Sequence, residues 1–447
     1  PCQRTHILAE ALSWRRAKVM ASSGEGTGSQ AVDARGMRLA NLSLVLAMIV
    51  RHAPVSQSRL IDLTGLKKPT ISSLVDELTR LGWVHVKGAA PSKVGRPRQL
   101  LAPNPGRGLI LVAQISVDHV ATLVVDFAGT ERARGSSAVD VCRLSQVDAF
   151  RRLADLVRGA LADAGAAPGQ VLGTALALPG IVGEHGELVY VPDVPWETAD
   201  VEGMLRSVLA DAVPPDSPLL VENEANLAAV AEQRPQAGRD VRNFVFLLGE
   251  LGVGAGVVID GTLFRGTRGA AGEVGHVSIA VDGPRCSCGK RGCWALYVSR
   301  DALLTSARDR RASDRASNLW DGPDSTAARP DELTPDRIVA AARAGDAVAG
   351  EALDGLRRHL AVGIGNIASA YDTEVVVLGG FLATAFAQDL HRLQGEVDDW
   401  LMGDLYDGLR VELSTHGHDA PLWGGVALVR QYLVANPRAV EPLPAAK

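Results

Sequence analysis

"GHVSIAVDGPRCSCGKRGC", residues 275–293, places one histidine and three cysteines in a short stretch that glycines interrupt. The spacing is His-x9-Cys-x-Cys-x4-Cys, formed by His276, Cys286, Cys288 and Cys293. Three thiolates and a neutral imidazole are a good tetrahedral ligand set for Zn2+, and four protein ligands leave no open position for a catalytic water. The alternative is a group of buried or redox-active thiols, although Cys-x-Cys differs from the Cys-x-x-Cys of redox pairs. We therefore predict a structural zinc site.

The cysteine count fits a reduced compartment. The chain of 447 residues contains five cysteines, an odd number of which three are clustered. Since a secreted disulfide framework usually has an even number, we expect a cytoplasmic protein in which Cys2 and Cys142 have no part in the site. The longest apolar runs, such as residues 42–50, are far shorter than the roughly 20 residues that a membrane span needs, and the N-terminus lacks a signal-peptide pattern. With 47% apolar residues, the chain can bury a core in each of two or three domains.

Charge is distributed unevenly along the chain. The net charge is −5, but residues 37–104 contain ten Lys or Arg and three Asp or Glu, a local balance of +7 that leaves −12 for the remainder. A basic segment joined to an acidic body indicates a polyanion as the partner of the first segment only.

Residues 37–104 also have the pattern of a winged helix-turn-helix. Three helices are predicted: a first one, a short second one capped by Ser56 and stopped by Gly65, and a third at residues 67–82. Two alternating strands flank the basic loop "AAPSKVGRPR". The expected buried stripes of the first and third helices are Leu42, Val45, Leu46 and Ile49, and Ile71, Leu74, Val75 and Leu78. The preceding residues 1–36 are predicted to be a flexible extension.

This domain is predicted to bind double-stranded DNA. Hydroxyl and basic side chains at the start of the third helix suit the major groove, and the wing loop places two arginines around a proline, which suits an A·T-rich minor groove. The predicted contact residues are Lys67, Lys68, Thr70, Ser72, Ser73, Arg96 and Arg98. The alternative is a domain for dimerisation or protein contact with a solvated basic face.

The rest of the chain alternates predicted strands and helices. Residues 108–129 and 243–266 each have the pattern of a glycine-containing strand pair, and each opens one half of this segment. The two halves suggest an internal duplication within an α/β body.

The residues around the cysteine cluster carry a family resemblance. "LGVGAGVVIDGTLFRGTRGAAGEVGHVSI" at 251–279 closely resembles the signature of the ROK family of bacterial sugar kinases and sugar-responsive repressors. The resemblance extends from Met37 to about Leu433 and includes "LALPGIVGEHGELVYVPDVPW", "VENEANLAAVAE", "YDTEVVVLGG" and "DAPLWGGVALV". It implies an actin-like (ribonuclease H-like) body of the sugar-kinase type, with sugar between a first lobe at 105–237 and a second lobe at 238–447. It also implies that the C-terminal helix returns to the first lobe.

Three elements that the family's kinases use depart from the kinase pattern. The turn resembling Asp-x-Gly-Gly-Thr reads "QISVDH" at 114–119, without the glycine pair that a tight phosphate turn needs. The turn resembling Gly-Thr-Gly reads "ELG" at 250–252, where a carboxylate would repel phosphate. Glu224 stands in place of the catalytic Asp of Asn-Asp-x-Asn, and its extra methylene moves the carboxylate by roughly 1 Å. We therefore expect no kinase activity.

The resemblance also implies an effector site. Asn223, Glu224, Glu273 and His276 match family positions that bind sugar hydroxyls, and the matching histidine of the family is both a zinc ligand and a sugar contact. Ala295 stands where the family usually has a sugar-contacting Glu, which indicates a different sugar, a sugar phosphate or no ligand. In the last case the polar groups would satisfy one another in an unliganded cleft.

Together these patterns predict a zinc-containing transcriptional regulator, a repressor of carbohydrate-metabolism genes that a sugar or sugar phosphate controls. Operator half-sites on one face of DNA lie about 34–36 Å apart, so a homodimer or homotetramer is expected. Two alternatives remain: an active ATP-dependent sugar kinase fused to a DNA-binding domain, and a regulator controlled by a protein partner.

Overall fold

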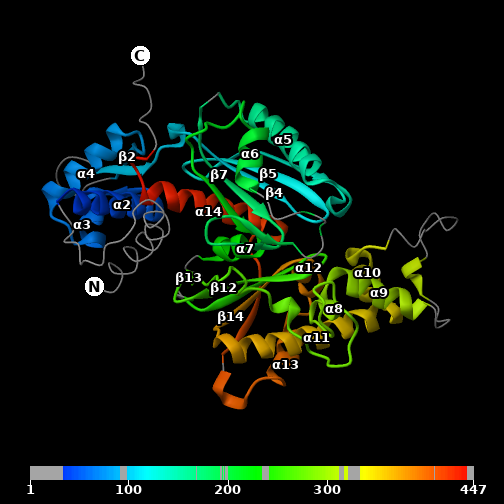
Figure 1. Ribbon diagram of the computed structural model, residues 1–447. Coiled ribbons are helices and arrows are strands. Elements are labelled where there is room, and N and C mark those ends of the chain that lie inside the picture. Colours follow the sequence, from blue (N-terminus) through cyan, green and yellow to red (C-terminus); the bar gives the residue numbers. More distant parts are fainter. Residues whose placement is uncertain are drawn as a thin grey trace.

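The computed structural model describes residues 34–90, 98–167, 169–191, 194, 196, 200–233, 241–311, 317–320, 333–406 and 408–439 (Figure 1). Residues 1–33 of the predicted extension and residues 91–97 of the predicted wing loop lie outside this part. Within it, no helix is long and apolar enough to cross a membrane.

The N-terminal domain, blue in Figure 1, consists of three helices and a three-stranded sheet of order β1-β3-β2. Its elements are α2 (Ala34–His52), β1 (Val55–Ser56), α3 (Gln57–Thr64), α4 (Lys68–Arg80), β2 (Val84–Ala90) and β3 (Arg98–Pro103). Both predicted caps of α3 are confirmed. The Ser56 hydroxyl accepts a hydrogen bond from the Arg59 N–H, and Gly65 ends the helix with a φ of 67°.

The predicted stripes of α2 and α4 form the core of this domain. All eight side chains are at most 3% exposed, and Trp83, at the start of the wing hairpin, is fully buried in the same apolar cluster. The strand β1 was not predicted, because two residues give no periodicity to detect. The winged helix-turn-helix fold is confirmed.

Two five-stranded sheets of the same topology form the body. Their orders are β10-β7-β4-β5-β6 and β13-β12-β11-β14-β15. In each sheet, three strands that follow one another in the chain pair antiparallel. A fourth strand pairs in parallel with the first of these three, and a fifth pairs in parallel with the fourth. This repeat agrees with the internal duplication that the two strand pairs suggested. The strands are β4 (Leu109–Ile115), β5 (His119–Asp126), β6 (Glu131–Ala138), β7 (Val171–Leu178), β10 (Leu219–Asn223), β11 (Phe244–Gly249), β12 (Val253–Ile259), β13 (Thr262–Leu263), β14 (Val375–Gly380) and β15 (Arg410–Leu413).

Helices cover both faces of each sheet. The helices α5 (Gln146–Asp163) and α6 (Val201–Val208) cover one face of the first sheet, and α14 (Ala420–Ala435) packs on the other. The second sheet carries α7 (Glu224–Glu232) on one face and a layer that includes α11 (Ala347–Tyr371) on the other. As Figure 1 shows, α7 and α14 therefore form the layer between the two sheets.

Candidate functional site

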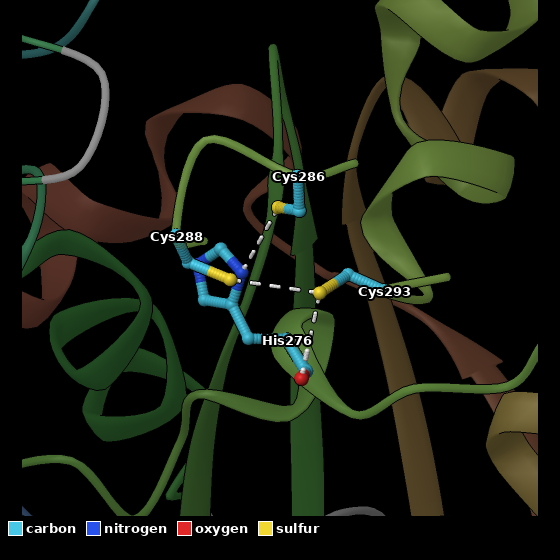
Figure 2. Close-up of side chains that lie close together, drawn as sticks. All are labelled: His276, Cys286, Cys288 and Cys293. Carbon is cyan, nitrogen blue, oxygen red and sulfur yellow. Dashed lines mark hydrogen bonds between the residues drawn. The ribbon is translucent and has the colours of Figure 1, made fainter. Parts of the chain in front are cut away.

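His276, Cys286, Cys288 and Cys293 converge on one point (Figure 2). Their ligand atoms all lie within 4.8 Å of one another. Cys286 Sγ is 3.6 Å from His276 Nδ1, and Cys288 Sγ is 3.6 Å from Cys293 Sγ. A tetrahedral ion with metal–sulfur distances of about 2.3 Å separates its sulfur ligands by about 3.8 Å. The predicted ligands are thus together in space, at separations that suit a four-coordinate metal.

Backbone geometry holds this cluster in place. His276 ends the 3-10 helix η3 (Val274–His276), and Cys293 belongs to an isolated β-bridge. The loop between them turns at Gly292, where φ is 63° and a Cβ would lie 1.7 Å from Ala280 O. Because only glycine fits at this turn, the placement of Cys293 opposite His276 depends on it.

Trp294 ties the cluster to the core of the second lobe. It is 1% exposed, and its Nε1 donates a hydrogen bond to His359 O in α11 at 2.8 Å. Gly363 of the same helix makes room for the indole, since a Cβ there would lie 2.0 Å from Trp294 Cε2. An ion bound by the four residues would therefore fix residues 276–293 to this helix.

The second ring nitrogen of His276 faces a carboxylate. His276 Nε2 lies 3.7 Å from Glu273 Oε2. Burial raises the pKa of Glu273, and the neighbouring His276 opposes this in part. Metal-binding histidines commonly present their other nitrogen to such a group, which fixes the orientation of the ring. The predicted effector residue Glu273 thus lies next to His276, which belongs both to the predicted effector site and to the Cys/His cluster.

The other two predicted effector residues, Asn223 and Glu224, lie at the start of α7. Asn223 Oδ1 accepts hydrogen bonds from the N–H groups of Ala225 and Asn226, at 2.8 and 3.0 Å, and Nδ2 donates to Gly180 O at 2.7 Å. Asn223 is therefore the N-cap of α7. This capping role was missed, although an Asn followed by Glu at a helix start is a usable signal for it.

The three elements at residues 114–119, 224 and 250–252 lie together in the body. Gln114 Nε2, from the first element, donates to Glu224 Oε2 at 3.3 Å. Burial, followed by the charge of Glu250 in the second element, raises the pKa of Glu224 to about 7. The carboxylates of Glu224 and Glu250, which belong to two of these elements, therefore lie close enough to repel each other.

An ion pair joins the lobes at the first of these elements. Asp118, in the turn between β4 and β5, accepts a hydrogen bond of 2.5 Å from Nη1 of Arg300, at the start of α9 (Arg300–Arg311). His119 Nδ1 lies 2.7 Å from the same carboxylate. The hydrogen bond with His119, together with Arg300, holds the pKa of Asp118 well below its usual value. Asp118 follows a strand of the first sheet, and α9 packs against α11 on the second sheet, so this contact joins the two halves of the body.

Sequence reasoning missed two basic residues that pair with these carboxylates. Arg300 pairs with Asp118, and its backbone N–H donates to Glu250 O at 3.0 Å. His418 Nδ1 lies 3.5 Å from Glu250 Oε1, and a hydrogen bond with this carboxylate raises the pKa of His418. The partners lie 182 residues apart in the case of Arg300, so no local pattern could have indicated them.

The predicted DNA contacts gather at the N-terminal end of α4. Lys67 is the N-cap of this helix, and its side chain makes no capping hydrogen bond within the part of the chain that the structure describes. Lys67, Lys68 and Ser73 are exposed, and Thr70 and Ser72 are half-buried. Arg96 lies outside the described residues, and Arg98 is described only as the first residue of β3. The residues predicted to contact the major groove are thus together at one helix end, and their DNA contacts, like those of the wing, stay predictions.

Comparison with known proteins agrees with this architecture. The ROK family matches residues 117–432, and the MarR family matches residues 43–93. The "Xylose repressor" of Caldicellulosiruptor bescii is 30% identical over 405 residues, which cover 89% of this chain and 97% of that protein. A solved ROK family transcriptional regulator, described as a homolog of the E. coli MLC protein, has a TM-score of 0.73 at 23% identity, covering 89% of this chain and 97% of that one. A ROK family glucokinase from Streptomyces griseus, solved with glucose and AMPPNP, has a TM-score of 0.64 at 26% identity, covering 72% of this chain and 100% of that one. The chain belongs to the ROK family.

Proposed function

We propose that this protein is a DNA-binding repressor of carbohydrate-metabolism genes, controlled by a sugar or sugar phosphate in the cleft between its lobes. One observation carries the proposal: a basic winged helix-turn-helix precedes a ROK body, in a chain similar to a xylose repressor over 89% of its length. D-xylose is therefore the first effector to test.

The body acts as a sensor and not as a kinase. Bound ATP needs backbone N–H groups and cations that face its phosphates. Here the carboxylates of Asp118, Glu224 and Glu250 belong to the three elements that resemble the kinase motifs, and the basic side chains of Arg300 and His418 already pair with two of them. This charge arrangement supports a body without phosphoryl transfer.

An active sugar kinase fused to a DNA-binding domain is the second candidate, favoured by the similarity to a glucokinase. Release of ADP from ATP in the presence of hexoses and pentoses distinguishes the two. We expect no turnover above background, and turnover with any of these sugars would establish the kinase.

We propose Zn2+ as the ion of the His276 cluster. Thiolates with one imidazole are a donor set that zinc favours, and four protein ligands make the site structural. His276 would hold the ion through Nδ1, the nitrogen that faces Cys286, and would keep Nε2 for Glu273 and the effector. The ion would thereby stiffen one wall of the sugar site.

Control by the effector works through a population shift. A sugar that binds one lobe arrangement better than another changes the spacing of two DNA-binding domains in a homodimer or homotetramer. A coupling of about 1–3 kcal/mol changes operator affinity by about 5- to 150-fold.

The function is tested by selecting genomic fragments that the full chain binds. We expect fragments beside sugar-metabolism genes, and a loss of affinity for them when D-xylose or another sugar from a panel is added. Fluorescence anisotropy measures that loss, and thermal unfolding measures sugar binding separately. If no sugar or sugar phosphate changes either quantity, control by a protein partner replaces this proposal.

A further inference from the structure

Helix α14 connects the cleft to the DNA-binding domain (Figure 1). It has 16 residues, a length of about 24 Å at about 1.5 Å per residue. At its N-terminal end, Asp419 accepts a 2.7 Å hydrogen bond from Arg134 of β6. The adjacent His418 lies beside Glu250, whose backbone oxygen accepts from the N–H of Arg300. This end of α14 is thus part of the ionic network that joins the lobes.

Along its length, α14 packs closely against α7 and the first sheet. A Cβ at Gly424 would lie 1.8 Å from Leu227 O of α7, and one at Gly425 would lie 2.6 Å from Val112 of β4. Val429 and other apolar residues of α14 share one buried cluster with the first sheet and with the core of the N-terminal domain. Because close-packed elements shift between discrete arrangements, a displacement at one end of this helix moves the other end.

At its C-terminal end, two hydrogen bonds attach the chain to the N-terminal domain. Ser43 Oγ in α2 donates to Ala435 O at 3.0 Å. Trp83 Nε1, at the base of the wing, donates to Pro437 O at 2.7 Å. Both acceptors are backbone oxygens, so these contacts fix the course of the chain directly after α14.

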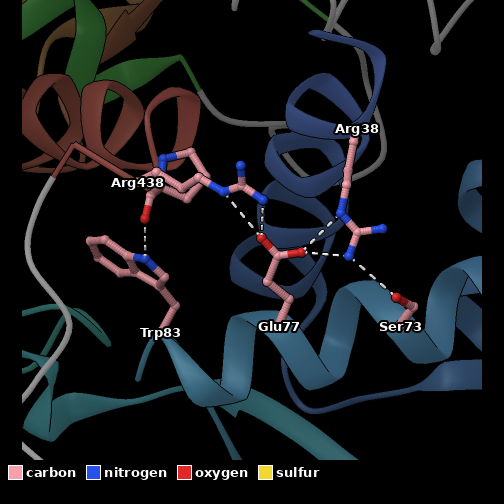
Figure 3. A network of polar contacts seen from close by, with 6 residues as sticks. Arg38, Ser73, Glu77, Trp83 and Arg438 are labelled. Atoms are coloured by element: carbon pink, nitrogen blue, oxygen red, sulfur yellow. Dashed lines mark hydrogen bonds and ion pairs between the residues drawn. The ribbon is translucent and has the colours of Figure 1, made fainter. Parts of the chain in front are cut away.

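Glu77 of α4 receives the third attachment (Figure 3). Its side chain is 6% exposed. Arg438 donates to Oε1 through Nε at 3.1 Å and through Nη2, while Arg38 of α2 donates to Oε2 through Nε at 3.1 Å and through Nη2 at 2.6 Å. Arg38 also donates to Ser73 Oγ, a predicted DNA contact, at 3.3 Å. Burial would raise the pKa of Glu77, but the hydrogen bonds from Arg438 and Arg38 outweigh it and lower this pKa. An ionised carboxylate thus joins α4, α2 and the chain after α14.

We propose that Glu77 and Arg438 are positioning residues for operator binding, through which α14 transmits the state of the cleft to the recognition helix α4. This inference rests on the proposed function and adds the route by which the effector site controls operator binding. Without Arg438, the buried carboxylate would keep only one of its two cations, which weakens the attachment of α4 to the body.

The route is tested without DNA, by hydrogen exchange of the α4 amides in the full-length chain. The variants are Asp419→Asn at the cleft end of α14, Arg438→Gln at the other end, and the two combined. If the two sites were not connected, the effects of the two substitutions would simply add. We instead expect Asp419→Asn to change the α4 exchange rates at least about threefold in the wild-type background and to have little effect when Arg438 is already replaced. Additive effects would overturn the proposal. If Arg438→Gln does not fold, Glu77→Gln breaks the same contact with a side chain of the same shape.

Operator binding gives the second readout, with the genomic fragments selected by the wild type. We expect Arg438→Gln to weaken binding at least about fivefold without changing the salt dependence, and Arg438→Lys to restore most of the affinity. A salt slope reduced by about 0.9 would mean that Arg438 contacts phosphate directly, which contradicts a positioning role. Arg392→Gln is the matched control, at an exposed arginine that pairs with Asp354 in the second lobe. If the wild type selects no fragment, the proposed function fails, and the exchange measurement still decides the route.

Discussion

Cys288 contributes one of the three sulfur atoms that gather beside His276 in the Cys/His cluster. We predict that Cys288→Ser lowers the zinc content from about one ion per chain to a small fraction, because a serine hydroxyl is a poor substitute for a thiolate. Elemental analysis measures this decrease, and thermal unfolding measures the accompanying loss of stability. Cys142→Ser, at a half-buried cysteine outside the cluster, is the control. A Cys288→Ser protein with a full equivalent of zinc would refute the ligand set.

Glu224 gives the stability of the body a pH dependence. Burial and the charge of Glu250 raise its pKa from 4.5 to about 7. Because the folded chain then binds the proton more tightly than the unfolded chain, the free energy of unfolding falls as pH rises from about 4.5 to about 7. We predict that Glu224→Gln removes this decline. The difference in melting temperature, variant minus wild type, should therefore increase with pH from about 4.5 to about 7 and stay constant at higher pH. Thermal unfolding at a series of pH values measures the trend, and a difference that does not vary with pH would contradict it.

At the level of elements, the start of α4 concentrates positive charge. Lys67 and Lys68 are exposed there, at the end of the helix where the N–H groups attract phosphate. We predict that replacing both with Ala weakens operator binding and reduces the slope of log affinity against log salt by roughly 0.9 for each phosphate that a lysine no longer neutralises. Arg151→Ala, at an exposed arginine of α5, is the matched control. An unchanged slope would mean that neither lysine binds a phosphate.

Local patterns explain which elements the sequence predicted. The stripes of α2 and α4 repeat every three or four residues, the caps of α3 adjoin the helix they end, and the four residues of the Cys/His cluster fall within one short stretch. Contacts between distant segments have no such signal. Arg300 and Asp118 lie 182 residues apart, and Arg438 and Glu77 lie 361 apart. The cleft network and the attachment of α14 could therefore be found only once the fold had brought these segments together.

In the whole molecule, two sheets of one topology meet through α7, α14 and the ion pair of Asp118 with Arg300. The helices pack against both sheets, so they restrain the lobes whether the cleft is open or closed. The ion pair differs, because it exists only while the turn after β4 lies beside the start of α9. It is thus a contact that favours the lobe arrangement in which Asp118 and Arg300 meet.

This difference allows a test of lobe movement. A partly exposed ion pair contributes up to about 1 kcal/mol, which shifts an equilibrium between closed and open lobes about fivefold. We predict that Arg300→Gln enlarges the radius of gyration of the ligand-free chain in small-angle X-ray scattering. Asp118→Asn should have the same effect, and the double variant should add little, since both changes break one contact. Arg158→Gln removes ion pairs with Asp155 and Asp211 inside the first lobe and should leave the radius unchanged. Equal radii for wild type and Arg300→Gln would mean that the helix layer alone sets the lobe arrangement.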